Sequence, residues 1–461
     1  MKKFIFTTLI LTIALFTACS DGNGNGEGAT YGRLHEMRDF GGKVITIGSW
    51  WEDPVPEVMW GDEEPDPATS SNYLVDRMMW DNARRVERAF NVRFEQVLVP
   101  DMDFIPQLSA SVLAREPFAD IVFLNGRMQM EAMGSLIQPW NTGNLPGSDV
   151  LGAQVFAKPL SEMDGDVWII ESHGADGHGF GLGVNMEIIA MDNLPNPVEL
   201  YEAGEWTWDA MFDIMNRATR DTTGGGVFDQ FGIAGQPGDI VMHFIGANDG
   251  VMVDDNLNYG FDHPNTMEAL EFLERIFHAR LWSPDGDGIM YGGNWERNFY
   301  SGFREANAVF FPIITWAISN APLAFEFRFV PFPQGPSNTS GNTWIRDLPQ
   351  GMGVTVGTEW EVADLLMIME ELFSWPDDEP ELLFLAGDID WMRVHYLTED
   401  CVQRAIQAAL NFHADIGRNV PTYYWVTGMF ASAFWEREMD VSGAVEYQRG
   451  PHQELLDMRF R

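Results

Sequence analysis

The fold prediction depends on residues 44–51, which read VITIGSWW. This short, mainly apolar run ends at a glycine before the two tryptophans, a pattern that predicts a buried strand. Two more apolar runs follow, at residues 92–99 and 121–124, and apolar residues at helical spacing fill the intervals, at 75–90 and 104–115. Strands that alternate with helices in this way predict a parallel sheet with helices on its faces.

The α/β pattern continues along the rest of the chain. Further strands are predicted at 167–170, 308–311 and 327–330, and amphipathic helices after Thr207, over 267–277 and over 362–373. The 461 residues are too many for one core and suffice for two lobes of about 150–200 residues each. We therefore expect two α/β lobes linked by strands that cross between them.

The composition excludes several classes of protein. A hydrophobic share of 45% with 21% charged residues is typical of a folded, soluble chain. Acids outnumber bases 69 to 28, and a net charge of −41 repels phosphates, so no nucleic-acid partner is expected. The only cysteines, Cys19 and Cys401, exclude a disulfide scaffold and a cysteine zinc site.

Residues 1–18 are typical of a bacterial signal peptide. Two lysines precede an uncharged run, and Cys19 follows the small residue Ala18, as in a lipoprotein cleavage site. The Gly/Asn-rich sequence that follows predicts a flexible tether over residues 19–40. We expect a lipid on Cys19 that anchors the chain to the extracellular face of the cytoplasmic membrane. A plain signal peptide with an incidental cysteine is the alternative.

Aromatic and polar side chains follow the predicted strands at the point where each strand ends. They are Trp50, Trp51 and Glu52 after the first strand, Asn125 and Arg127 after the third, and Trp316 after the strand at 308–311. Ligands of open parallel sheets sit at the carboxyl ends of the strands. Aromatic faces stack on sugar C–H groups and carboxylates accept hydroxyl hydrogen bonds, so this set favours a sugar site. The alternative is that these tryptophans pack in a core.

Candidate metal and catalytic motifs are weaker. His173, Asp176 and His178 have metal-like spacing near Glu171, but histidines form no cluster elsewhere and a glycine-rich connector explains the segment without a metal. The loop 221–229 has glycines where a calcium loop needs oxygen ligands. No nucleophile elbow, phosphate loop or zinc-protease motif is present in the sequence. We therefore expect no metal, no cofactor and no enzymatic activity.

Several segments, in their order and spacing, resemble one family. They are PFADI at 117–121, PNPVELY at 195–201, GEWTWD at 204–209, TRDT at 219–222, DQFGI at 229–233, ANDG at 247–250 and VPFPQGP at 330–336. The chain resembles the extracellular solute-binding proteins of family 1, the lipoprotein receptors of ABC sugar importers. The likeness runs from about residue 42 to 375.

The resemblance implies a type II periplasmic-binding fold, with two lobes of parallel-type sheets, hinge strands and a central ligand cleft. Lobe 1 would comprise residues 41–165 and 330–400, and lobe 2 residues 166–329 and 401–461. The implied protein is a monomer that binds a carbohydrate, closes around it and delivers it to the permease without changing it.

The resemblance also adds residues to the expected cleft. Glu171, His173, Trp344 and Asp347 join the six strand-end residues, whereas Trp206 and Trp208 would be structural because they open a helix. Three other functions stay open: a non-sugar ligand such as a peptide, a sensor for a membrane kinase, and a secreted acidic hydrolase.

Overall fold

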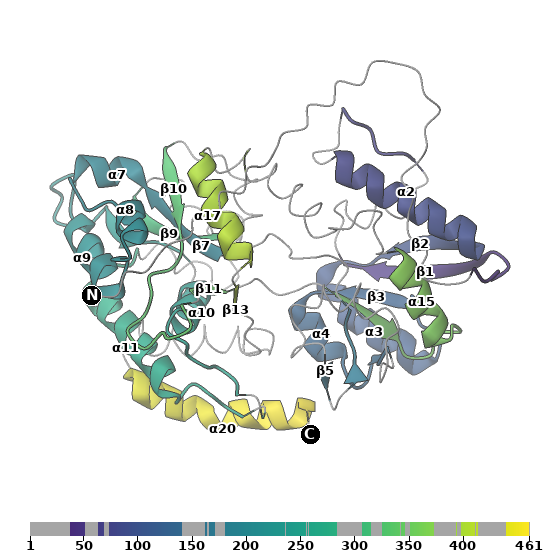
Figure 1. Cartoon of the computed structure of the whole chain (residues 1–461). Helices are drawn as coiled ribbons and strands as arrows, with labels where there is room; N and C mark the ends of the chain where they lie inside the picture. The colour runs from purple at the N-terminus through teal and green to yellow at the C-terminus, as the bar shows by residue number, and fades with distance from the viewer. Residues whose placement is uncertain are drawn as a thin grey trace, which may run out of the picture.

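The computed structural model describes the greater part of the chain. The described residues are 37–50, 63–68, 73–140, 162–163, 166–170, 180–235, 237–254, 256, 258–283, 307–314, 325–341, 343–345, 351–372, 393, 398–410, 412–413 and 439–460. They form two lobes that lie side by side in Figure 1.

The first lobe is built on a five-stranded sheet of order β2-β1-β3-β12-β4. β1 (Lys43–Ser49) lies between β2 (Val92–Leu98) and β3 (Ile121–Leu124) and is parallel to both, which confirms the predicted strand–helix–strand pattern. β12 (Gly351–Thr355) returns from much later in the chain and pairs antiparallel with β3 and with β4 (Ile137–Gln138).

Helices cover both faces of this sheet. α2 (Tyr73–Phe90) and α15 (Val362–Leu372) pack on one face, and α3 (Asp101–Ala114) and α4 (Gly126–Ala132) on the other. Alternation along β3 supplies both cores, since Ile121 faces the first pair of helices and Val122 the second. The two helices of the first pair are also joined by Arg85, whose Nη1 lies 3.0 Å from the buried carboxylate of Glu371.

The second lobe has a four-stranded sheet of order β10-β7-β9-β8. β7 (Phe180–Asn185) is antiparallel to both β9 (Ala308–Ile314) and β10 (Phe327–Val330), and β8 (Phe231–Ile233) is parallel to β9. The sheets are therefore mixed, where parallel-type sheets were predicted. The physical reason is the same in both lobes. β12 and β7 each follow a connection from the other lobe, and each pairs antiparallel with the strands on both of its sides.

The helices that follow β7 along the chain enclose the core of the second lobe. They are α7 (Met186–Met191), α8 (Pro197–Glu202), α9 (Trp208–Ala218), α10 (Pro237–Gly246) and α11 (Pro264–His278). The remaining short strands form two small pairs, β5 (Glu162–Met163) with β6 (Asp166–Val167) and β11 (Trp344–Ile345) with β13 (Phe412–His413).

The tryptophans at the start of α9 are structural, as predicted. Both are buried, and their Nε1 atoms donate to backbone carbonyls 2.8 and 3.0 Å away, Trp206 to Pro331 and Trp208 to Pro333. Thr207 between them caps the helix, because its hydroxyl oxygen accepts from the backbone N–H of Ala210. The GEWTWD segment thus ties the chain after β10 to the second lobe.

α17 (Glu399–Leu410) closes the open edge of β10. The backbone N–H of Phe329 donates to the Cys401 sulfur at 3.3 Å, and the Arg404 Nε donates to the Phe329 carbonyl at 2.7 Å. Both backbone groups would otherwise be unpaired at a sheet edge. Cys401 is a free, buried thiol with this structural role.

The C-terminal helix α20 (Val441–Phe460) packs along the second lobe, at the bottom of Figure 1. The Tyr259 hydroxyl donates to the Val445 carbonyl at 2.6 Å, and Arg449 lies 2.8 Å from the Asp262 carboxylate. His452 is buried against the Tyr259 ring, and its burial lowers its pKa to about 4. The imidazole is therefore neutral at physiological pH and packs as an aromatic residue.

Two connections between the lobes meet at one point of the first lobe. Ile170 precedes the segment 171–179 that leads to β7, and Met352 follows the segment 346–350 that comes from β11. The two residues form an antiparallel bridge, with N–O distances of 3.0 and 2.7 Å. Gly351 allows the approach, because a Cβ there would overlap the Ile169 side chain and lie 3.0 Å from the Ile170 carbonyl oxygen.

We expect Gly351→Ala to lower the free energy of unfolding by about 1–3 kcal/mol, since the added methyl group must displace packed neighbours. Gly450→Ala is the matched control, because a Cβ at Gly450 in α20 has no neighbour within 4 Å and alanine favours helix. Chemical denaturation of both variants measures the difference. Equal stability of the two variants would show that the bridge does not need the glycine.

Candidate functional site

The parallel strands of the first lobe bring three predicted strand ends to one edge of the sheet. Trp50 follows β1, Asp101 follows β2 after Val99 and Pro100, and Asn125 follows β3. The Asn125 Nδ2 lies 3.4 Å from the Asp101 Oδ1. This edge, defined here by Trp50, Asp101 and Asn125, is the candidate site in the described part of the lobe.

Asn125 is held in one orientation by its place in the chain. As the N-cap of α4, its side-chain oxygen accepts from the backbone N–H of Met128 at 3.0 Å. The amide nitrogen is then directed at Asp101. Arg127 occupies the first turn of the same helix, but its side chain lies outside the described residues.

Asp101 is a residue of this candidate site that the sequence analysis missed. It begins α3 and is half-buried, so its carboxylate can accept hydrogen bonds from a ligand at this edge. The signal was present in the sequence: residues 92–99 are a predicted strand, and the strand-end rule that selected Trp50 and Asn125 also selects Asp101.

The Trp50 side chain is only partly buried in the core of the first lobe. Its indole is half-buried and packs against the cluster that includes Val99, Phe104 and Leu124, on the α3–α4 face of the sheet. Part of the ring therefore contributes to the core, and the remainder lies at the edge. Its predicted role in ligand binding stays a prediction.

Most of the other predicted residues lie outside the described parts of the chain. This holds for Cys19, Trp51, Glu52, Glu171, His173, Trp316 and Asp347, and for the side chain of Trp344, whose backbone belongs to β11. Glu171 directly follows Ile170, at the point where the first connection leaves the bridge to Met352. Their roles also stay predictions.

The acidic loop 221–229 is a tight turn stabilised by its own residues. The Asp221 carboxylate accepts from the backbone N–H groups of Gly224, Gly225 and Gly226, at 2.5–3.2 Å. The hydrogen bond from Gly226 is the main cause that holds the pKa of Asp221 below its usual range. No group of three or more His, Cys, Asp or Glu side chains is placed to hold a metal within the described ranges.

No helix in the described part of the chain is long and apolar enough to cross a membrane. The sequence matches no protein-family model, and a comparison with curated proteins finds no match.

Solved structures, in contrast, match over about nine-tenths of the chain. The sugar-binding protein MalE from Xanthomonas citri has a TM-score of 0.61 at 12% identity, covering 90% of this chain and 98% of its own. An ABC substrate-binding protein from Listeria monocytogenes, in complex with cycloalternan, has a TM-score of 0.59 at 12% identity, covering 91% and 100%. The cyclic alpha-maltosyl-1,6-maltose binding protein from Arthrobacter globiformis has 0.59 at 15%, covering 91% and 97%.

These similarities define the class of fold. The chain has the two-lobed α/β fold of the ABC substrate-binding proteins, which confirms the fold expected from the sequence resemblance. At identities of 12–15%, the similarity shows a shared fold and does not by itself identify the ligand.

Proposed function

We propose that the protein is an extracellular receptor that binds a carbohydrate between its lobes and delivers it to an ABC permease. The observation that carries this proposal is the similarity of fold, over about nine-tenths of the chain, to substrate-binding proteins, of which one was solved with cycloalternan and another is named for cyclic alpha-maltosyl-1,6-maltose. An oligosaccharide is therefore the first ligand to test. The proposal includes no reaction on the sugar, because a receptor of this kind releases its ligand unchanged.

The chemistry of the candidate site supports a hydroxylated ligand. The Asp101 carboxylate accepts hydrogen bonds, and the Asn125 amide offers a donor that its N-cap interaction already orients. A sugar hydroxyl donates and accepts at once, so it can satisfy both groups. Trp51 and Trp316 would add ring faces that stack on the sugar C–H groups.

Lobe closure would supply the signal to the permease. Each lobe has separate hydrophobic clusters, and two connections between the lobes start from the single bridge between Ile170 and Met352. A ligand that contacts both lobes favours the closed arrangement by as much as it binds that arrangement more tightly. The lipid on Cys19 would keep this monomeric receptor at the membrane that holds the permease.

Binding should be detectable as a gain in stability. At 100 times its dissociation constant, a ligand adds about 2.7 kcal/mol to the free energy of unfolding. We expect an oligosaccharide such as maltotetraose or cycloalternan to raise the melting temperature of the mature protein.

The predicted tryptophans can be tested by substitution. We expect Trp316→Ala, and at least one of Trp50→Ala and Trp51→Ala, to weaken saccharide binding roughly 30- to 1000-fold, measured by calorimetry.

The control for these variants is Trp206→Phe, which removes the hydrogen bond to Pro331 inside the core. It should lower stability by about 1 kcal/mol and leave affinity unchanged. A screen in which peptides shift the melting temperature and saccharides do not would assign a different ligand to the same fold. Tryptophan variants that melt early and bind normally would place those rings in the core.

Asp101 offers a second, sharper test. We expect Asp101→Ala to weaken saccharide binding about 10- to 100-fold, because a hydrogen bond to a charged group contributes about 1.5–3 kcal/mol. Asp103→Ala is the matched control: Asp103 also lies in the first turn of α3, but is exposed. Both variants lose the same favourable interaction with the helix dipole, so equal affinities would remove Asp101 from the site.

A further inference from the structure

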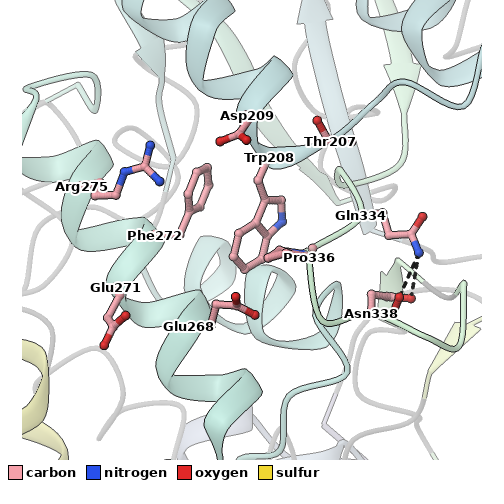
Figure 2. A pocket seen from close by; sticks show the side chains of 11 residues that line it. Thr207, Trp208, Asp209, Glu268, Glu271, Phe272, Arg275, Gln334, Pro336 and Asn338 are labelled. Carbon is pink, nitrogen blue, oxygen red and sulfur yellow. Dashed lines mark hydrogen bonds between the residues drawn. The ribbon is translucent and has the colours of Figure 1, made fainter.

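A hollow of about 620 Å³ lies on the second lobe, away from the candidate site of the first lobe. It is formed by the start of α9, one side of α11 and the segment 334–338, as Figure 2 shows. Its lining residues come from α9, α11 and the segment 334–338, which is hydrogen-bonded to the second lobe through Asn338 and the Ala247 carbonyl. Its volume falls within the range of sites for small molecules, about 300–1,000 Å³.

The floor of the hollow is apolar and rigid. The rings of Trp208 and Phe272 stack with their centroids 4.6 Å apart and an interplanar angle of 21°. Both side chains are buried, and the Trp208 Nε1 is fixed by its hydrogen bond to the Pro333 carbonyl. A ligand would meet a surface that needs no rearrangement, so little ordering would oppose its binding.

The rim carries polar groups of both signs: the carboxylates of Asp209, Glu268 and Glu271 and the guanidinium of Arg275. The Glu268 carboxylate accepts a hydrogen bond from the Asn248 Nδ2 at 2.9 Å. Asp209 and Glu271 are exposed, and neither carboxylate has a hydrogen-bond or ion-pair partner within the described ranges. Arg275 is also exposed; its guanidinium lies 4.7 Å from the ring centre of Phe212 and forms no ion pair in the same part of the chain. Figure 2 shows all three around the Trp208 indole.

A mixed rim of this kind discriminates between classes of ligand. An anion would meet the carboxylates of Asp209, Glu268 and Glu271, and a cation would meet the Arg275 guanidinium, so neither sign is matched throughout. A hydroxyl group can donate to Asp209 or Glu271 and accept from Arg275. A neutral, polyhydroxylated molecule with apolar C–H faces therefore fits the rim and the floor together.

We propose that this hollow is a second carbohydrate site, which takes one or two sugar units of an oligosaccharide outside the space between the lobes. The choice of saccharides as the ligand class rests in part on the proposed function, whereas the site itself does not involve the first lobe. Its polar groups are exposed, so binding in the millimolar range is expected. A receptor with such a site would hold long or branched saccharides at a second point of its surface.

The indole N–H of Trp208 is a direct probe of the floor. We expect millimolar maltotetraose to shift the NMR signal of this group, assigned with Trp208→Phe, in a saturable way. Asp209→Ala, Glu271→Ala and Arg275→Ala should each weaken this saturation at least tenfold. Glu205→Ala is the control, because Glu205 is exposed, carries the same charge and does not line the hollow.

A second set of variants separates this proposal from the proposed function. In the double variant Asp101→Ala with Trp316→Ala, calorimetric binding between the lobes should be lost while the Trp208 signal still shifts. A Trp208 shift that disappears in this double variant would mean that the signal only senses lobe closure, and would overturn the second site. An absent shift in the wild type, or one unaffected by the rim variants, would overturn it too. A shift that persists without any calorimetric binding in the wild type would instead contradict the proposed function alone.

Discussion

The antiparallel bridge between Ile170 and Met352 is the contact on which the arrangement of the lobes depends. It holds two chain segments side by side where they leave the first lobe, and Gly351 makes the approach possible. β7 and β12 then enter their sheets antiparallel to their neighbours. Within the described residues, each lobe has hydrophobic clusters of its own around these strands.

The same topology explains where polar residues gather. In the first lobe, the three parallel strands end together and place Trp50, Asp101 and Asn125 at one edge. In the second lobe, the tryptophans of the segment 204–209 serve packing, and a hollow with polar groups at its rim lies above the stacked rings of Trp208 and Phe272. The aromatic richness of the chain thus has two uses, one in the cores and one at candidate sugar surfaces.

Local patterns predicted most of what the structure shows in the first lobe and around α9. Strands β1 to β3, the helices between them and the Thr207 cap depend on neighbouring residues, so periodicity and capping chemistry suffice. The mixed direction of the sheets could not be predicted in this way, because it depends on antiparallel pairings between strands far apart in the sequence, such as Phe123 with Met352 and Leu182 with Pro312. The contact of Cys401 and Arg404 with Phe329 is similarly non-local.

The candidate site was only partly predictable for a related reason. Strand ends identify Trp50 and Asn125, but the distance between Asp101 and Asn125 emerges only when β1 separates β2 from β3 and all three are parallel. Trp50 shows the limit of the rule, because a strand end can also face a core. Neither the strand-end rule nor the strand order identifies the ligand, because the ligand depends on how the two lobes face each other when closed.

The central claim, that the two lobes close around a saccharide, is tested most directly by small-angle X-ray scattering of the mature protein with and without the saccharide that stabilises it most. The account predicts a smaller radius of gyration in the bound state, and a loss of this change in the Asp101→Ala and Trp316→Ala double variant. Tight saccharide binding with an unchanged radius of gyration would contradict it.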